Sequence, residues 1–351
     1  MGGLLASPPP RPAARADRID DATVSRSDPA IADLGTLEAA AEVVHSFVQP
    51  TAQICWPLLS ERSGCELWVK HENHTPIGSF KARGGLVYLD DLKKSQPAVS
   101  GVIAATTGNF GQAVAFAATS MGLKATIVVP HGNSLEKNAS MRAFGGELAV
   151  HGRDFDEAYD YAFSVAEERG LHMMKSFHPL LVLGVASYGL EFLRAAPELD
   201  TVYVPIGLGS GICGMVAARE ALGLKTRIVG VVAEKAATYA LSFERGEPVA
   251  TDSADTFADG MAVRVPDADA LAVILKAVER IVTLSEDEIR AAMRHYFTDT
   301  HNLAEGAGAA PLAALLKERE KMAGKRVGLI LSGGNIDREV YLKVLAEGSI
   351  R

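Results

Sequence analysis

The sequence has few cysteines and no long apolar run. Its 351 residues include only three cysteines, Cys55, Cys65 and Cys213, and their spacing fits neither a disulfide framework nor a metal site. Free thiols in a reducing compartment are the simpler interpretation, so the cytoplasm is the expected location. No apolar stretch is long enough to cross a bilayer, and no membrane partner is expected.

A surplus of basic residues is also missing. The chain has 35 Lys and Arg against 43 Asp and Glu, a formal net charge of −8, so the basic footprint of a nucleic-acid-binding protein is absent. The composition is that of a globular protein, with 48% hydrophobic and 22% charged residues. The chain is long enough for one large or two ordinary domains. Residues 1–35 begin with a segment rich in Pro, Ala, Gly and Arg without a secretory apolar core, and are interpreted as a flexible leader.

Strand-like and helix-like segments alternate over most of the chain. Such alternation predicts parallel β-α-β units and therefore an α/β protein. Apolar runs such as Thr126 to Val129 suit strands that are buried on both faces. The expected strands are 65–71, 99–105, 125–130, 147–151, 201–205, 227–232 and 326–331. The expected helices are 36–48, 81–92, 108–121, 135–144, 154–169, 180–195, 211–222, 267–280, 285–298, 305–322 and 337–345, with a loop-rich region at 243–266.

The segment from His71 to Gly85 places a lysine at the start of a predicted helix. Turn residues precede Ser79, which is a favourable N-cap, so Lys81 is expected in the first helical turn. The positive end of the helix macrodipole lies there and lowers the pKa of a lysine, which helps a neutral amine act as a nucleophile. A single lysine in such a place is usually an ordinary surface residue, so this interpretation depends on the other segments.

Three further segments lie where a predicted strand ends, and the first two open a predicted helix. They are Thr106-Thr107-Gly108-Asn109-Phe110-Gly111-Gln112, Pro205-Ile206-Gly207-Leu208-Gly209-Ser210-Gly211-Ile212-Cys213-Gly214 and Leu331-Ser332-Gly333-Gly334-Asn335. Glycines let backbone N–H groups approach an anion closely, and a helix N-terminus favours negative charge. Each segment alone is as well explained by a turn. Gly209, Gly211 and Gly214 also satisfy the dinucleotide spacing, with Glu234 as a ribose-binding acid, so a nicotinamide-dependent oxidoreductase stays an alternative.

Taken together and in this order, the Lys81, Asn109, glycine and Ser332 segments resemble the fold type II pyridoxal-phosphate enzymes of the tryptophan synthase β-like family. Within that family they most resemble the threonine and serine dehydratases, and the resemblance covers about residues 36–340. It implies a two-domain α/β fold in which each domain is a mainly parallel sheet flanked by helices. A small mobile domain is implied at 103–180, and a large cofactor-binding domain at 36–102 plus 181–351. A homodimer or higher homo-oligomer is expected, and no C-terminal regulatory domain is expected because the chain ends soon after its last helix.

The resemblance also implies roles for single residues. Lys81 would hold pyridoxal 5'-phosphate as a Schiff base and, once freed, would remove the α-proton of an amino-acid substrate. The implied cofactor contacts are Phe80, Lys81, Asn109, Gly207, Leu208, Gly209, Ser210, Gly211, Glu305 and Ser332. The implied substrate contacts are Ser79, Thr106, Thr107, Gly108, Asn109 and Phe110, with the substrate carboxylate on the loop from Thr106 to Asn109. Asp259-Gly260 resembles a family loop near the cofactor ring.

Two residues of the first glycine segment depart from the family pattern. Thr107 stands where the family usually has the serine that related racemases use as acid and base; it keeps a hydroxyl, but its methyl group stiffens and crowds it. With Lys81 it is the expected catalytic pair. Phe110 replaces the usual histidine and favours a more apolar substrate side chain. Glu234 matches the first ligand of a divalent ion in some relatives, but residues 236–240 lack the expected Asp, so no metal is expected.

The expected activity is dehydration and deamination of a 3-hydroxy amino acid such as L-threonine or L-serine to a 2-oxo acid and ammonia. The β-hydroxyl is expected to leave after protonation through the cofactor phosphate. A neutral hydroxyl at Ser332 beside the pyridine nitrogen suits elimination, because the ring is then a weaker electron sink. The alternatives are a lyase for a bulkier substrate such as an aryl-serine, supported by Phe110, and a racemase or β-replacement enzyme, disfavoured by Thr107.

Overall fold

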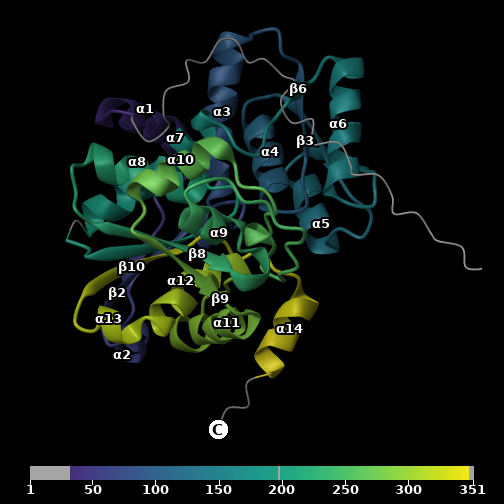
Figure 1. The fold of residues 1–351 in the computed structure, drawn as a ribbon. Helices are drawn as coiled ribbons and strands as arrows, with labels where there is room; N and C mark the ends of the chain where they lie inside the picture. The colour runs from purple at the N-terminus through teal and green to yellow at the C-terminus, as the bar shows by residue number, and fades with distance from the viewer. Residues whose placement is uncertain (1–31, 197, 348–351) are drawn as a thin grey trace, which may run out of the picture.

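The computed structural model describes residues 32–196 and 198–347. They form one six-stranded and one four-stranded sheet, each mainly parallel and each covered by helices on both faces (Figure 1). The predicted α/β class is therefore confirmed. Of the expected leader at 1–35, only residues 32–35 are among the described residues, and helix α1 already begins at Leu34.

The six-stranded sheet brings three of the predicted segments to one edge. Its order is β1 (Gln53–Cys55), β2 (Glu66–His71), β10 (Arg326–Leu331), β7 (Thr201–Pro205), β8 (Arg227–Ala233) and β9 (Arg280–Leu284). Strand β1 pairs antiparallel with β2, and the other neighbours pair in parallel. Because β2, β10 and β7 are adjacent and parallel, their carboxyl ends lie side by side. The Lys81, Ser332 and Gly207 segments follow those three ends.

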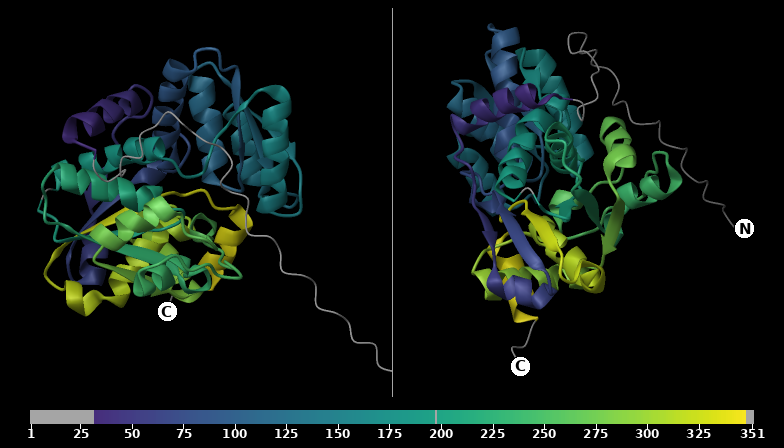
Figure 2. Two further views of the ribbon diagram at one scale, coloured as in Figure 1. Left: turned by 45° about the horizontal axis from the view of Figure 1, so that its top comes forward. Right: turned by 90° about the vertical axis from the view of Figure 1, so that its left-hand side faces the viewer.

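Two sets of helices cover the six-stranded sheet, and each set closes over its own cluster of buried apolar side chains (Figure 2). One face carries α1 (Leu34–His45), α7 (Pro179–Ala195), α8 (Ser210–Ala221), α9 (Thr238–Arg245) and α10 (Ala268–Ala277). The other face carries α2 (Pro57–Ser63), α11 (Glu286–Thr300), α12 (Gly306–Lys317), α13 (Arg319–Met322) and α14 (Arg338–Ala346). The sheet is therefore buried on both sides, as its apolar strands require.

The four-stranded sheet has the order β5 (Gly146–Val150), β4 (Lys124–Val129), β3 (Gly101–Ala105) and β6 (His172–Met173), and its pairings are parallel. Helices α3 (Lys81–Ser95), α4 (Asn109–Ser120) and α5 (Leu135–Ala143) pack on one face, and α6 (Phe155–Arg169) packs on the other. The expected domain boundary between 102 and 103 falls inside β3, and the boundary at 180 falls inside α7.

Helix α3 touches α7 backbone to backbone. A Cβ atom added at Gly184 would stand 2.3 Å from the carbonyl oxygen of Arg83, and one at Gly84 would stand 2.9 Å from that of Leu181. No side chain fits between the two helices there. On the other side of α3, a Cβ at Gly85 would stand 3.2 Å from the Ala113 carbonyl oxygen in α4. The helix that begins at Lys81 is thus held closely on both sides.

Five of these elements were not expected from the sequence. Strands β1 and β6 are only three and two residues long, too short to leave a pattern. Two residues separate strand β9 from the end of α10, and the first residue of β9, Arg280, was included in the expected helix 267–280. Helices α2 and α9 have seven and eight residues and lie where no element was expected, apart from the end of α9, which falls in the loop-rich region 243–266. In each case pairing or packing in the fold supplies what the local sequence does not show.

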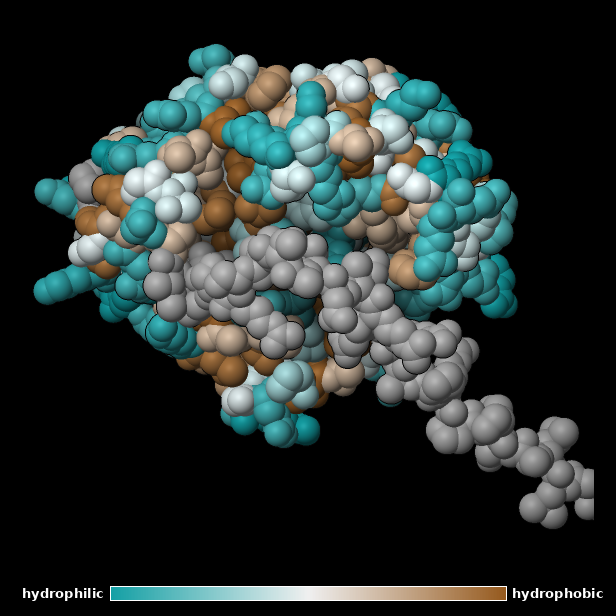
Figure 3. All heavy atoms as spheres, turned by 90° about the horizontal axis from the view of Figure 1, so that it is seen from above, coloured by the Kyte–Doolittle hydropathy of each residue, from teal (hydrophilic) through white to brown (hydrophobic). Residues whose placement is uncertain are grey.

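Among the residues that the structure describes, no helix is long and apolar enough to span a membrane. On the face seen in Figure 3, hydrophobic side chains form small groups between hydrophilic ones. Exposed apolar residues scattered in this way are normal for a globular protein.

Candidate active site

Lys81 is the first residue of α3, and its amine points toward the start of α8. The Lys81 Nζ atom lies 3.4 Å from the Ser210 hydroxyl oxygen and 5.0 Å from the centre of the Phe80 ring. Burial lowers the pKa of Lys81 to about 8, and the Glu305 carboxylate acts in the opposite direction. The lowered pKa agrees with the expectation, but its largest cause is burial rather than the helix macrodipole. At neutral pH roughly a tenth of such amines are uncharged, far more than for an exposed lysine.

The segment from Gly207 to Gly211 forms a loop of bare backbone between β7 and α8. Gly209 has a φ of 106°, a left-handed conformation that favours glycine. A Cβ atom at Gly207 would stand 2.2 Å from the carbonyl oxygen of Gly260, so only glycine fits there as well. Because α8 begins at Ser210, its first N–H groups have no acceptor inside the helix. These groups and the dipole of the helix make the loop a suitable site for a phosphate.

Two buried tyrosines hold this glycine loop from behind. The Tyr239 hydroxyl donates to the Leu208 carbonyl oxygen at 2.9 Å, and the Tyr188 hydroxyl donates to the Gly211 carbonyl oxygen at 2.6 Å. Tyr188 also meets the Phe80 ring edge-on, with centroids 6.1 Å apart. Neither tyrosine could be predicted as a support of the loop, because Tyr188 lies in α7 and Tyr239 in α9, both outside the glycine segment in the sequence.

The third predicted segment lies against the residues that precede Lys81. The Phe80 N–H donates to the Ser332 carbonyl oxygen at 3.0 Å, and the Gly334 N–H donates to the Gly78 carbonyl oxygen at 3.0 Å. Ser332 is buried, with 3% of its surface exposed. The expectation that Ser79 caps α3 is wrong, because Phe80 occupies the N-cap position and no side chain bonds to the helix there. The buried Ser79 hydroxyl has no hydrogen-bond partner within the described residues.

Glu305 is a buried carboxyl group between Asn109 and the Ser332 segment. Its Oε1 atom accepts from the Asn109 amide at 2.8 Å, and its backbone N–H donates to the Gly333 carbonyl oxygen at 3.1 Å. Its Oε2 atom is buried without a partner in the described part of the chain. Burial is the main cause that raises the pKa of Glu305 to about 8, and Asp259 adds to it. The side chain is therefore mostly neutral at pH 7.

Asn335 links Asn109 to the Lys81 side of the site. Its amide nitrogen donates to the Asn109 side-chain oxygen at 2.8 Å and to the Ile77 carbonyl oxygen at 2.7 Å. Both polar atoms of the Asn109 side chain are thus bonded within the protein. Asn335 was expected only as the last residue of the Ser332 segment, although an asparagine directly after two glycines is a signal that could have found it.

The loop from Thr106 to Phe110 presents its residues in different directions. Thr106 is buried and its hydroxyl accepts from the Gly108 N–H at 3.2 Å, whereas Thr107 is exposed. Phe110 is 8% exposed and packs in the apolar cluster between α4 and the four-stranded sheet. The Phe110 ring thus packs with core residues, and its effect on the choice of substrate stays a prediction.

These features fit pyridoxal phosphate. The partly neutral Lys81 amine is a suitable partner for an aldehyde, and the Gly207–Gly211 loop is a suitable cradle for a phosphate. Buried polar atoms are normally hydrogen-bonded, yet Ser79 Oγ and Glu305 Oε2 have no partner among the residues described. A bound group with polar ring atoms supplies what these oxygens lack.

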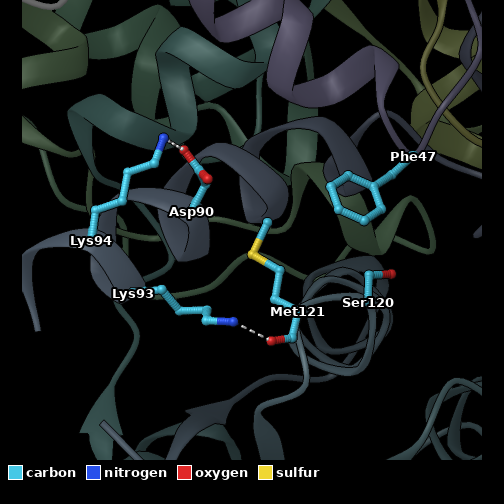
Figure 4. A pocket seen from close by; sticks show the side chains of 6 residues that line it. All are labelled: Phe47, Asp90, Lys93, Lys94, Ser120 and Met121. Atoms are coloured by element: carbon cyan, nitrogen blue, oxygen red, sulfur yellow. Dashed lines mark hydrogen bonds and ion pairs between the residues drawn. The ribbon is translucent and has the colours of Figure 1, made fainter. Parts of the chain in front are cut away.

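A surface pocket of about 460 Å³ lies elsewhere on the molecule (Figure 4). It is lined by Phe47, Asp90, Lys93, Lys94, Ser120 and Met121. Its two ammonium groups already have partners, because Lys94 pairs with Asp90 at 2.6 Å and Lys93 donates to the Met121 carbonyl oxygen at 2.7 Å. It contains none of the predicted site residues and lies near the far end of α3, about 20 Å from Lys81 at 1.5 Å per residue.

No group of three or more His, Cys, Asp or Glu side chains within residues 32–196 and 198–347 is arranged to hold a metal ion. Glu234, considered as a ligand of a metal or of a ribose, is exposed at the end of β8. Gly214, the third glycine of the dinucleotide spacing, has a packing role instead. A Cβ atom there would stand 2.9 Å from the Ala186 backbone nitrogen, where α8 crosses α7.

Comparison with known proteins gives one consistent answer. The family model described as pyridoxal-phosphate dependent enzyme matches residues 44–333. An L-threonine ammonia-lyase of Thermotoga maritima is 33% identical over 319 residues, which cover 91% of this chain and 79% of that protein. The processed form of threonine deaminase isoform 2 from Solanum lycopersicum superposes with a TM-score of 0.84 at 29% identity, over 91% of this chain and 95% of the other. Maize serine racemase superposes with a TM-score of 0.83 at 26% identity, over 90% and 97%.

The family match covers the Lys81, Asn109 and glycine segments and includes Ser332 and Gly333 of the fourth, and it excludes the nicotinamide alternative. The cofactor of this chain is pyridoxal phosphate, as the resemblance implied. The chain belongs to the family of pyridoxal-phosphate-dependent enzymes.

Proposed function

We propose that the protein converts L-threonine to 2-oxobutanoate and ammonia, and L-serine to pyruvate and ammonia. The observation that carries this proposal is the Lys81 amine, which has a pKa of about 8 and lies 3.4 Å from Ser210 at the glycine loop. The relative from Thermotoga maritima, which is named an L-threonine ammonia-lyase, supports threonine as a substrate. The net reaction removes water across the α and β carbons and then adds it back as ammonia is released.

Bound pyridoxal phosphate draws electrons from the α-carbon of the amino acid and so makes the α-proton acidic. In this proposal the neutral Lys81 amine accepts that proton at Nζ. A pKa of about 8 suits a general base at physiological pH, because the amine is partly neutral and still basic enough to hold the proton.

In this proposal backbone N–H groups bind both the substrate carboxylate and the cofactor phosphate. The N–H groups at the start of α4, in the segment from Thr106 to Asn109, bind the substrate carboxylate. The loop from Gly207 to Gly211 holds the cofactor phosphate at the start of α8, where the Phe80 ring lies about 3.5 Å from the position of a Gly211 Cβ. Ser332 and the neutral Glu305 are the proposed neighbours of the pyridine ring.

Replacement of the amine tests the proposal. Lys81→Ala is expected to lose 2-oxobutanoate formation and the visible absorbance of the bound cofactor, because the variant has no amine for either task. Lys235→Ala, which removes an exposed lysine after β8, is the matched control and is expected to keep both. A yellow, active Lys81→Ala protein would refute the assignment.

A second candidate activity is serine racemisation, supported by the fold that the chain shares with maize serine racemase at 26% identity. The methyl group of Thr107 disfavours this activity, but its hydroxyl is kept and is exposed on the loop before α4. Racemisation needs an acid on the face opposite Lys81, whereas elimination does not. Thr107→Val removes the hydroxyl at nearly constant shape. If both activities exist, the variant stops D-serine formation, measured by chiral chromatography, and keeps pyruvate formation.

We further propose that residues 103–180 form a mobile part that closes on the substrate, that the protein is a homo-oligomer and that it works in the cytoplasm. The described free cysteines, of which Cys65 and Cys213 are buried, support a reducing compartment. Sedimentation analysis and cell fractionation test the last two proposals. A monomer at micromolar concentration, or recovery outside the cytoplasmic fraction, would contradict them.

A further inference from the structure

Lys137 is a buried lysine whose side chain links a helix of the four-stranded sheet to a segment that packs on the six-stranded sheet. It lies in the first turn of α5, on the four-stranded sheet, and only 7% of its surface is exposed. Its ammonium forms an ion pair with Asp259 in the short helix η3 (Asp259–Met261), which packs against α12 of the other sheet. A lysine is rarely this buried without a specific partner. A cation in a first helical turn also opposes the helix dipole, so helix stability does not explain it.

The Lys137 ammonium faces three carboxyl groups of the large sheet's side. Burial works against its charge, but Asp259, Glu305 and Asp337 together raise its pKa. The start of α5 is anchored over these groups. The Glu136 carboxylate accepts from the Arg338 N–H at 3.0 Å, and the Ser134 hydroxyl donates to Asp337. Lys137 is thus a charged residue at neutral pH in a fixed position.

One of these carboxyl groups lies beside the loop proposed to bind the substrate carboxylate. A Cβ atom placed on Gly108 would stand 3.7 Å from the Asp259 Oδ2 atom. An amino-acid carboxylate bound at the start of α4 would therefore lie close to the Asp259 side chain. Two like charges a few ångströms apart in a partly buried site repel strongly unless a cation is near.

We propose that Lys137 is a positioning residue for substrate binding: its ammonium neutralises Asp259 beside the Thr106–Asn109 loop, and an amino-acid carboxylate can bind there only because of it. This inference rests on the proposed function, since that loop is the proposed carboxylate site. If Lys137 only held the two sheets together, its loss would weaken the binding of all ligands of the site to the same extent. In contrast, loss of Lys137 should weaken the binding of ligands that carry a carboxylate and leave the binding of amines without a carboxylate nearly unchanged.

Glycine and methylamine make this distinction measurable, because they differ by the carboxylate. Neither has a group to eliminate, so both report binding alone. The holoenzyme is titrated with each, and binding is followed by the change in cofactor absorbance. In Lys137→Met we expect the dissociation constant of glycine to rise by about ten- to a hundredfold, and that of methylamine to change less than about twofold. Lys137→Arg is expected to restore most of the glycine affinity.

Two further variants keep the test decisive. Lys124→Met removes an exposed lysine from β4 of the same sheet and is expected to bind both ligands like the wild type. Lys137→Met/Asp259→Asn removes both charges of the pair, so it is expected to bind glycine within about threefold of the wild type. If Lys137→Met fails to fold, the double variant still tests the inference, because it leaves no unpaired Asp259 carboxylate behind.

Two results would overturn the inference. One is an equal loss of glycine and methylamine binding in Lys137→Met, which indicates a purely structural role. The other is glycine binding by the double variant that stays more than tenfold weak. With L-threonine as substrate, KM is expected to rise and kcat to change little. A wild-type enzyme that fails to turn over threonine but binds glycine in a Lys137-dependent way refutes the proposed function and leaves this inference standing.

Discussion

The protonation of Glu305 should make the stability of this protein depend on pH in an unusual direction. Its carboxyl group is 3% exposed, one of its oxygens has no partner among the described residues, and burial raises its pKa from 4.5 to about 8. Between these two values the folded protein keeps a proton that the unfolded chain has released. Stability must therefore fall as the pH rises from about 4.5 to about 8.

The magnitude follows from the size of the shift. A rise of about 3.5 pH units at 1.36 kcal/mol each corresponds to about 5 kcal/mol of unfolding free energy, fully present below pH 4.5 and lost above pH 8. Glu305→Gln stays neutral at every pH and keeps an acceptor for the Asn109 amide. The variant should thus match the wild type near pH 5 and exceed it by several degrees in Tm near pH 8.5.

The assay is thermal unfolding of the cofactor-free proteins at pH 5, 6, 7, 8 and 8.5. Glu318→Gln is the matched control, because Glu318 is also buried but its contacts with Arg280, Lys321 and Tyr203 outweigh burial and lower its pKa to about 2. Loss of this group destabilises the protein by the same amount throughout that range. A constant difference between wild type and Glu305→Gln from pH 5 to 8.5 would refute the reasoning, since it means that the carboxylate is already charged at pH 5.

Three further predictions concern residues around the site. Tyr239→Phe leaves the Leu208 carbonyl oxygen without its donor; we expect a loss of about 1–3 kcal/mol in urea unfolding and a raised dissociation constant for pyridoxal phosphate. Arg83→Met strips the fully buried Glu72 of its counterion and should cost about 3–5 kcal/mol, measured as a lowered Tm, unless Glu72 takes up a proton. Because burial lowers the pKa of Lys81, the rate at which the cofactor-free protein takes up pyridoxal phosphate should rise with pH and reach half its maximum near pH 8; a midpoint above pH 10 would contradict this.

The alternation of strands and helices was enough to predict the fold class. Strands β2, β7 and β10 were expected nearly at their observed bounds, because each is a short segment rich in Val, Leu, Ile, Trp or Tyr that precedes a segment with glycine or turn residues. Their order in the sheet was not predictable from periodicity, since β10 comes from the end of the chain and inserts between β2 and β7. That insertion is what brings Ser332 next to Phe80.

The parts of the site that were missed depend on contacts between segments far apart in the sequence. Lys137 and Asp259 are separated by 122 residues, and each is an unremarkable charged residue until α5 and η3 meet. Packing also decides the surroundings of Phe110. Its neighbours in the loop are polar and glycine-rich, but its position in the first turn of α4 directs the ring into the core. Burial of this kind is decided by packing, which one sequence does not display.

The contact between α3 and α7 limits how the proposed mobile part, residues 103–180, can move. With the Arg83 carbonyl pressed against Gly184, α3 cannot slip along α7 without a collision, so the Lys81 amine keeps its register in the large part of the molecule. On its opposite side α3 packs against α4, where a Cβ atom at Gly85 would stand 3.2 Å from the Ala113 carbonyl oxygen and 3.4 Å from the Ala117 methyl group, farther than the 2.3 Å between a Gly184 Cβ and the Arg83 carbonyl oxygen. If residues 103–180 move as proposed, the movement has to occur at the contact of α3 with α4. In that proposal Lys81 keeps its place and the Thr106–Asn109 loop moves.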